Sequence, residues 1–401
     1  MKAQFVSLLA LCFSAGIIAG CSTSASQSNA STSAPGNQAI SLNSSWNHKT
    51  AAAYLDYREE WWMQWKGAAR GQSTFCVSCH TTIPYLLARP QLDRMLGENA
   101  HSPDEQKLMD DVVTRVRDWS AEKPYYADSK ENPHQSQGAR GTESVLNAFI
   151  LANHDFATGQ FSHDTQLALE HMWSEQIQAG EDKGAWHWQQ FDLEPWESRN
   201  AVYYGATLAA AAVGMTPKDY QGSSTLQSHV ELLRDYLNRH YAQQCLLDRV
   251  ELLWAATRFH GLIDSNRQSE IIKRVFAMQR ADGGWNTSSL VVVQGWNRAR
   301  LMGIFGRRND GSPQYQQSDG LATGMIVSAT LQAGIPPTNP HVQRGLEWLR
   351  EHQNADGSWT ASSLNKLRDP ESYIGRFMSD AATGYAVLAL SEEATQSATR
   401  R

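Results

Sequence analysis

Two stretches of the sequence nearly superimpose and indicate how the chain folds. Residues 278–290 read MQRADGGWNTSSL, and residues 352–364 read HQNADGSWTASSL. Both contain the pattern Q-x-A-D-G-x-W-x-x-S-S-L at corresponding positions. Because self-similarity at a fixed spacing is the mark of repeat architecture, we expect the C-terminal part of the chain to be a repeat protein.

Each copy of this pattern sits between two segments with helical character. Residues 269–280 and 342–352 precede the two copies, and the Asp-Gly pair supplies a turn with positive φ that ends each helix. Downstream, residues 318–324 (SDGLATG) and 379–384 (SDAATG) open apolar, Ala-rich segments. The repeating unit is therefore expected to be a helix, a Gln-to-Trp turn and a second helix.

Weaker copies of the unit lie upstream. Residues 169–178 followed by Trp186 imitate the turn with a longer spacing, and residues 198–213 supply an Ala-rich partner helix. Two more small-residue or apolar segments, 143–153 and 248–260, suit inner helices. Few runs alternate polar and apolar residues with a period of two, so we expect an all-α body.

The turn pattern resembles that of a known superfamily. Q-x-x-x-G-x-W after a helix is similar to the turn motif of squalene cyclases and protein prenyltransferases, the terpenoid cyclase superfamily, over roughly residues 136–395. The resemblance implies an α/α toroid, with inner helices around a central cavity and outer helices around them. It also implies that Gln279, Trp285, Gln353 and Trp359 brace helix ends. This is physically sensible, because an amide can bond a terminal carbonyl and an indole can cover a turn.

The sequence departs from the catalytic members of that superfamily. It lacks the Asp-x-Asp-Asp run with which squalene-hopene cyclases protonate an alkene. Cys245 also lacks the Asp and His partners that hold zinc in prenyltransferases. Neither activity transfers to this chain, because function resides in the site and not in the fold.

Asp319, Asp380 and Glu197 are the weak candidates for catalysis. Asp319 and Asp380 open equivalent inner helices, with Thr323 and Thr383 about one turn later, so these side chains can face the mouth of the toroid. We favour the alternative that both aspartates are N-caps, since repetition in two units suits scaffolding better than one active site. Glu197 ends a Trp-rich stretch that borders either a polar site or a packed lid.

The N-terminus predicts export and a lipid anchor. Residues 1–20 combine a basic start, an apolar run too short to span a bilayer and small residues, which is typical of a signal peptide. Ala-Gly before Cys21 resembles a bacterial lipoprotein signal, which implies cleavage and lipid attachment at Cys21. Residues 21–45 are small and polar, as in a flexible tether. We expect the protein on the periplasmic side of a bacterial membrane, with the outer membrane favoured.

The strongest chemical motif is FCVSCH at residues 75–80, in which Cys76, Cys79 and His80 form the C-x-x-C-H signature of c-type haem attachment. Two thiols can form thioethers to one haem, and the next imidazole becomes the proximal iron ligand. Three alternatives are weaker. A thioredoxin-like pair lacks its βαβ context, a zinc site lacks a second ligand pair, and a disulfide would close a very small, strained loop. We therefore expect one covalent haem c in residues 46–135.

The sixth iron ligand is not assigned by the sequence. Four residues lie within reach, and each also suits packing: Met63, Met95, His101 and Met109. Residues 46–135 are few for a complete cytochrome c domain. This segment either holds the haem with help from the rest of the chain or leaves one iron position open.

Composition narrows the function. The chain has 35 basic and 41 acidic residues, and this net charge of −6 argues against nucleic acid as a partner. We hypothesise a haem protein for electron transfer, with a redox partner protein, or a haem-dependent oxidoreductase acting on an apolar, terpenoid-like ligand. The alternatives are a haem-independent toroid enzyme, such as a cyclase-like isomerase or a polysaccharide lyase, and a non-catalytic module that presents haem to a membrane complex.

Overall fold

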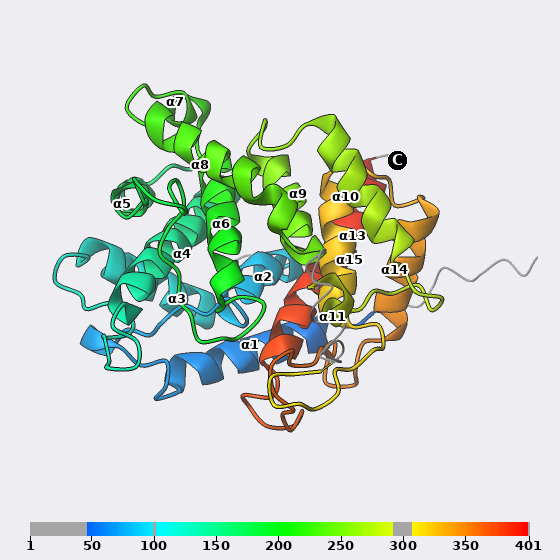
Figure 1. Cartoon of the computed structure of the whole chain (residues 1–401). Helices are drawn as coiled ribbons and strands as arrows, with labels where there is room; N and C mark the ends of the chain where they lie inside the picture. The colour runs from blue at the N-terminus through cyan, green and yellow to red at the C-terminus, as the bar shows by residue number, and fades with distance from the viewer. Residues whose placement is uncertain (1–45, 99–101, 292–306, 400–401) are drawn as a thin grey trace, which may run out of the picture. The chain divides into compact units, whose positions relative to one another are not determined.

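The computed structural model describes residues 46–98, 102–291 and 307–399, and this part of the chain contains helices and no strand (Figure 1). These described residues belong to one compact unit. The expected signal peptide, Cys21, the tether and His101 lie outside the described residues. The helices of four or more residues are α1 (His48–Gln64), α2 (Thr82–Leu96), α3 (Pro103–Arg117), α4 (Gln135–Thr158), α5 (His163–Ser174), α6 (Val202–Gly214), α7 (Lys218–Gln221), α8 (Gln227–His240), α9 (Leu246–Arg258), α10 (Ser265–Ala277), α11 (Thr287–Leu290), α13 (Gly320–Gln332), α14 (Pro340–Glu351) and α15 (Phe377–Thr399).

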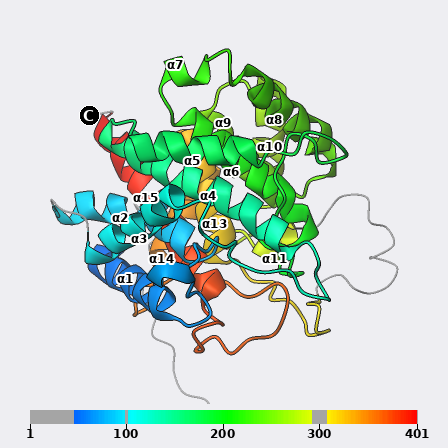
Figure 2. The ribbon, with the colours of Figure 1, turned by 90° about the vertical axis from the view of Figure 1, so that its left-hand side faces the viewer.

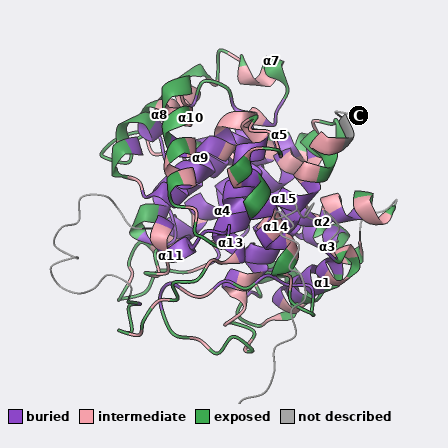
Figure 3. Cartoon of the chain, turned by 90° about the vertical axis from the view of Figure 1, so that its right-hand side faces the viewer, coloured by how far each residue is buried: buried purple, intermediate pink, exposed green. Residues whose placement is uncertain are grey.

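Six helices form an inner layer in which each contacts the next, in the order α4, α6, α9, α13, α15 and α2. Two of them are buried along almost their whole length, α6 from Val202 to Val213 and α13 from Gly320 to Leu331. Figure 3 shows this inner layer as predominantly buried. A helix enclosed by neighbours is apolar on all sides, which explains the Ala-rich segments of the sequence.

The outer layer consists of amphipathic helices. α5, α8, α10 and α14 pack on α4, α6, α9 and α13, respectively, and Figure 2 shows α5 lying beside α4. α10 buries only Ile271 and Val275, so most of its surface faces solvent. Helical hairpins in two layers constitute an α/α toroid, and the all-α toroid expected from the repeats is confirmed.

The Trp of each turn fastens the turn to the outer helix before it. Each indole Nε1 donates a hydrogen bond to a carbonyl in the last turn of that helix, Trp186 to Met172 (2.6 Å), Trp285 to Val275 (2.6 Å) and Trp359 to Leu349 (2.7 Å). All three indoles are buried. These bonds satisfy carbonyls that a helix end leaves without an intrahelical partner.

The Gln of each turn links it to the next outer helix. Gln279 Nε2 donates to the carbonyl of His341 at the start of α14 (2.8 Å), and Gln353 Nε2 donates to the carbonyl of Asn47 (3.1 Å). Asn47 is the N-cap of α1, so α1 stands where the next outer helix would be. Gly357 is required at this junction, because its φ is 92° and a Cβ would lie 2.2 Å from the backbone of Thr50.

The N-terminal helices therefore continue the series of repeats. α1 packs on α2 and α15, and α2 takes the place of an inner helix beside α15. Residues 46–135, which we expected to be a separate haem-bearing segment, belong to the same compact unit as the toroid. The sequence does not indicate that α1 and α2 form a further repeat unit, since the connection between them lacks the Q-x-A-D-G-x-W pattern.

Candidate functional site

The loops that precede three inner helices, α2, α6 and α15, meet at a pocket of about 100 Å³, which we call the His80 pocket. His80 comes from the first loop, Trp196 and Glu197 from the second, and Phe377 and Met378 from the start of α15. Helix N-termini carry a partial positive charge, so this end of the inner layer favours anionic groups.

A chain of hydrogen bonds fixes the tautomer of His80. The Thr81 hydroxyl donates to Asp380 Oδ2 (2.8 Å). The hydroxyl oxygen of Thr81 also lies 2.8 Å from His80 Nδ1. Because a hydroxyl has one proton and Thr81 uses it toward Asp380, Thr81 must accept from Nδ1–H. The proton is therefore on Nδ1, and Nε2 presents a lone pair that has no hydrogen-bond partner among the described residues.

Aromatic side chains enclose the His80 ring. Phe377 stacks on one face with 3.9 Å between ring centroids, and Trp62 meets the ring edge-on at 5.0 Å. Burial, and next the positive charge of Arg58, lower the pKa of His80 to about 3. The imidazole is accordingly neutral at physiological pH and acts as a hydrogen-bond acceptor at Nε2.

Asp380 is the anchor of this arrangement. The Arg58 guanidinium donates to both carboxylate oxygens from Nε (2.6 Å) and Nη2 (2.8 Å), and the Tyr54 hydroxyl adds a third bond (2.9 Å). Both charged side chains are almost completely buried. Asp380 lies inside the first turn of α15, which begins at Phe377, so our expectation of an N-cap is wrong for this residue.

Glu197 is the titratable carboxyl group of the pocket. Its backbone is held by an antiparallel pair of hydrogen bonds with Leu193, at 2.8 and 3.1 Å. Burial raises the pKa of Glu197 to about 7, because loss of solvent disfavours the charged carboxylate. Burial also raises the pKa of the neighbouring Glu194, but hydrogen bonds from Ser198 and Asn200 oppose that shift. Glu197 can thus accept or release a proton near neutral pH.

A guanidinium group completes the pocket. Arg368 is half-buried in its lining and has no ion-pair partner among the described residues. The loop that carries it is tied to the Glu197 loop, since Asn365 Nδ2 donates to the carbonyl of Glu194 (2.8 Å) and its Oδ1 accepts from Glu194 N (2.9 Å). The same lining contains the carboxyl groups of Glu194 and Glu197. A guanidinium group that forms no ion pair with them is suited to a carboxylate ligand.

The two cysteines of the C-x-x-C-H motif are buried free thiols. Burial raises the pKa of Cys76 to about 12 and that of Cys79 well above its usual value. The Cys76 carbonyl accepts from Trp62 Nε1 (2.7 Å), which fixes the loop. Both groups are therefore protonated at neutral pH and are poor nucleophiles.

The arrangement does not provide the space that a haem requires. The free Nε2 of His80 is the atom that a proximal ligand uses. Its Nδ1 bonds the Thr81 hydroxyl, whereas a ligating histidine usually donates to a carboxylate, a backbone carbonyl or water. However, cofactor pockets typically measure roughly 300–1,000 Å³, and the His80 pocket is about 100 Å³. Neither thiol lines it. Covalent haem attachment at Cys76 and Cys79 stays a prediction of the motif, but the described residues do not fit a haem at this position.

The residues considered for the sixth iron ligand lie elsewhere. Met63 is buried in the core, Met95 accepts a hydrogen bond from the Ser391 hydroxyl (3.3 Å), and Met109 packs against the core. None of these methionines lines the His80 pocket. The methionine that does is Met378, which we did not single out from the sequence.

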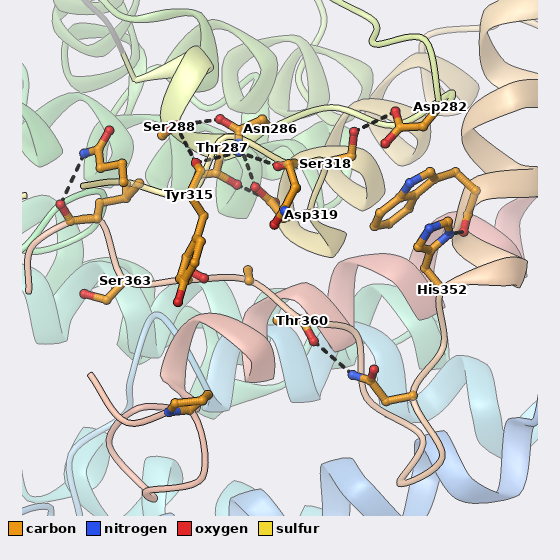
Figure 4. A pocket seen from close by; sticks show the side chains of 18 residues that line it. Asp282, Asn286, Thr287, Ser288, Tyr315, Ser318, Asp319, His352, Thr360 and Ser363 are labelled. Atoms are coloured by element: carbon orange, nitrogen blue, oxygen red, sulfur yellow. Dashed lines mark hydrogen bonds between the residues drawn. The ribbon is translucent and has the colours of Figure 1, made fainter. Parts of the chain in front are cut away.

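A larger pocket of about 520 Å³ lies between the two Gln-to-Trp turns, and we call it the turn pocket (Figure 4). Asp319 lines it as the N-cap of α13, where Oδ1 accepts from Ala322 N (2.9 Å). Asp319 also accepts two hydrogen bonds of 2.6 Å from the backbone and the hydroxyl of Thr287. These bonds occupy the carboxylate, so its role is structural.

Sequence reasoning missed Arg368, Asn365 and Met378. All three lie in or beside the loop after the second turn, which has no repeat pattern and no recognisable motif. A lone Arg in a loop is ordinarily solvated, so no local signal distinguishes Arg368. Only the packing of three distant loops brings it beside His80 and Glu197.

Two further features concern the described residues as a whole. No cluster of three or more His, Cys, Asp or Glu side chains in the described ranges could hold a metal ion. Among the helices described, none has the length and apolar character needed to cross a membrane.

Comparisons with known proteins establish the fold. No protein-family model matches the sequence, and no curated protein is detectably similar to it. A solved polysaccharide lyase is similar with a TM-score of 0.51 and 11% identity, over 88% of this chain and 98% of that chain. A glycosidase has a TM-score of 0.48 at 12% identity, over 86% of this chain and 98% of its own.

The GH76A α-1,6-mannanase from Salegentibacter sp. HEL1_6 has a TM-score of 0.47 at 11% identity, over 87% of this chain and 99% of its own. At these identities the likeness to the lyase concerns the α/α toroid alone. The reaction must be argued from the side chains of the site.

Proposed function

We propose that the protein is a haem-independent enzyme of the toroid, a lyase that cleaves an acidic polysaccharide by β-elimination. The observation that supports this most strongly is the composition of the His80 pocket. A carboxyl group with a pKa near 7, an imidazole with a fixed lone pair and an unpaired guanidinium line one cavity. These are a proton-transfer group, a hydrogen-bond acceptor and a binding group for a carboxylate.

The relative basicities decide which group moves the proton. The pKa of Glu197 is about 7 and that of His80 is about 3, so the Glu197 carboxylate is the stronger base by several powers of ten. A general base is most effective when its pKa lies near the working pH. We therefore assign proton transfer to Glu197 and orientation of a sugar hydroxyl to His80 Nε2.

The reaction follows from these assignments. Glu197 removes the proton next to the carboxylate of a uronic acid, and the electrons of that C–H bond form a carbon–carbon double bond. The glycosidic C–O bond breaks, and its oxygen leaves with the electron pair and receives the proton from Glu197. Arg368 neutralises the uronate carboxylate, which lowers the energy of the carbanion-like transition state.

The proposed location agrees with this substrate. We propose that the protein is exported and held to a membrane through Cys21, as the first 45 residues predict. Polymeric acidic glycans occur outside the cytoplasm, where such an anchor would place the catalytic unit.

The test uses the purified protein with alginate and polygalacturonate, and with mannan and xylan as neutral controls. The expected result is ultraviolet absorbance of the conjugated double bond with an acidic glycan and none with the neutral ones. Glu197→Gln should lose about 10²–10⁴-fold in turnover. Glu175→Gln is the matched control, because burial also raises the pKa of Glu175, which does not line the pocket.

Other results would contradict the proposal. New reducing ends without ultraviolet absorbance would indicate a hydrolase. Equal activity of Glu197→Gln and the unaltered chain would remove Glu197 from the reaction.

Attachment of haem at Cys76 and Cys79 stays a prediction of the motif, and a separate experiment tests it. The chain is produced with export and haem-maturation machinery, and its visible spectrum is recorded after acid-acetone extraction. A covalently retained haem would contradict the haem-independent enzyme proposed here. A protein without haem that still turns over an acidic glycan would support it.

A further inference from the structure

The turn pocket has the size and lining of a sugar-binding site. Its volume of about 520 Å³ lies within the range of ligand pockets, roughly 300–1,000 Å³. Most polar groups of the lining are neutral hydroxyls and amides, including Ser288, Gln314, Thr360 and Ser362, and the carboxylates of Asp282 and Asp319 are also present. Such groups match the hydroxyls of a sugar, which both donate and accept hydrogen bonds.

The polar groups of the turn pocket divide into a rigid wall and an open rim. In the wall, Asn286 accepts a hydrogen bond from Ser288 (2.5 Å), and Asp319 binds Thr287 (Figure 4). At the rim, the hydroxyls of Tyr315 and Ser362 have no hydrogen-bond partner among the described residues. The wall thus positions the pocket, and the rim offers unpaired groups to a ligand.

One large aromatic side chain in the lining of the turn pocket stays open to solvent. Tyr315 lines the turn pocket and is 53% exposed. Large apolar groups that stay exposed on a loop lining a pocket indicate a contact surface. The C–H face of a sugar ring packs on an aromatic ring, so Tyr315 supplies a stacking platform.

The turn pocket adjoins the His80 pocket. Ser363 lines both, and its carbonyl accepts from Arg308 Nε at 2.6 Å, which ties the two loops together at the junction. A chain of sugars bound in the turn pocket can therefore continue toward Glu197. We propose that the turn pocket is a subsite that binds an acidic glycan one or more sugars away from the bond that is cleaved. This inference rests on the proposed lyase function.

The test measures binding and turnover separately. Binding of long and short oligogalacturonides and oligoalginates to the Glu197→Gln variant is followed by calorimetry, with and without Tyr315→Ala. The expected result is about fivefold to tenfold weaker binding of the long oligomers and unchanged binding of the shortest ones. Tyr315→Phe separates the ring from the hydroxyl and should retain most of the affinity. Phe156→Ala is the matched control, because Phe156 is 52% exposed and lines neither pocket.

The outcomes distinguish this inference from the function on which it rests. If oligomers bind through Tyr315 but no glycan is cleaved, the subsite stands and the lyase proposal fails. If glycans are cleaved and Tyr315→Ala changes neither affinity nor the preference for long chains, the subsite is overturned. It is also overturned if Tyr315→Ala reduces binding to phosphatidylglycerol vesicles only, since the rim would then be a membrane-contact surface.

Discussion

The starts of α13 and α15 share a short sequence pattern but differ in chemistry. In both, a Thr hydroxyl about one turn after the Asp accepts from the backbone N–H of a turn Trp at 3.0 Å, Thr323 from Trp285 and Thr383 from Trp359. The preceding aspartates differ. Asp319 bonds only neutral partners, whereas Asp380 forms an ion pair with Arg58 and binds Thr81.

The difference comes from the neighbour of each helix. The next inner helix beside α13 belongs to another copy of the repeat. Beside α15, the next elements in space are α1 and α2, and α1 and the loop before α2 supply Arg58 and His80. The contact with α1 thus makes Asp380, inside the first turn of α15, part of the candidate catalytic site. In a repeat protein, the place where the repeat pattern breaks is thus a good place to look for function.

The largest expected effect is the loss of stability when the ion pair of Asp380 in α15 is removed. Arg58→Leu leaves Asp380 buried without its counter-charge, which should cost about 3–5 kcal/mol of unfolding free energy. Urea denaturation measures it. The control Arg117→Leu removes an exposed ion pair with Asp164, which solvent screens, and should cost far less. Similar losses in the two variants would show that Asp380 does not depend on Arg58.

Asp319→Ala tests whether the aspartate at the start of α13 has only a structural role. The variant removes an N-cap and two bonds to Thr287, so we expect a loss of about 1–2 kcal/mol in the same assay, with cleavage of the shortest acidic oligomers retained. A loss as large as that of Arg58→Leu, or a loss of turnover on the shortest oligomers without unfolding, would make the two aspartates equivalent after all.

Thr81→Val examines the link between Asp380 and His80. Without the hydroxyl, Nδ1 loses its acceptor and the ring is no longer held in one tautomer, so turnover should fall by up to about tenfold. Ring nitrogen chemical shifts report the tautomer directly. The control Thr82→Val alters a buried Thr that binds Glu59 and should leave the His80 ring unchanged.

A further expected effect is on the pH dependence of stability. Because the folded pKa of Glu197 is raised from 4.5 to about 7, its protonated form stabilises the fold below about pH 4.5, and this contribution is lost as the pH rises through 7. Glu197→Gln should therefore be more stable than the unaltered chain above pH 7. Unfolding curves at acidic and alkaline pH check this, and a gain confined to acidic pH would contradict the sign.

Much of the fold was predictable from the sequence. The Q-x-A-D-G-x-W pattern predicted the turns, because the bonds of Trp285 and Gln279 are local to one repeat and its neighbour. The place of α1 and α2 was not predictable. The contact that shows it joins Gln353 to Asn47, which are 306 positions apart.

The candidate site was predictable only in its parts. His80 and Glu197 were both singled out, the first as an iron ligand and the second as a weak catalytic candidate. Their shared pocket depends on loops before α2, α6 and α15, and the pKa of Glu197 depends on its burial there. The C-x-x-C-H motif directed attention to haem chemistry, since a local pattern contains no information about the space beside the imidazole.

The most direct test of the acid–base site is the pH dependence of kcat/KM on an acidic glycan. The ionised form of Glu197 is the proposed base, so kcat/KM should rise with pH through about 7 and then level off, and Glu197→Gln should abolish this rise together with most of the turnover. A profile that falls through pH 7, or one that keeps its shape in Glu197→Gln, would contradict the account.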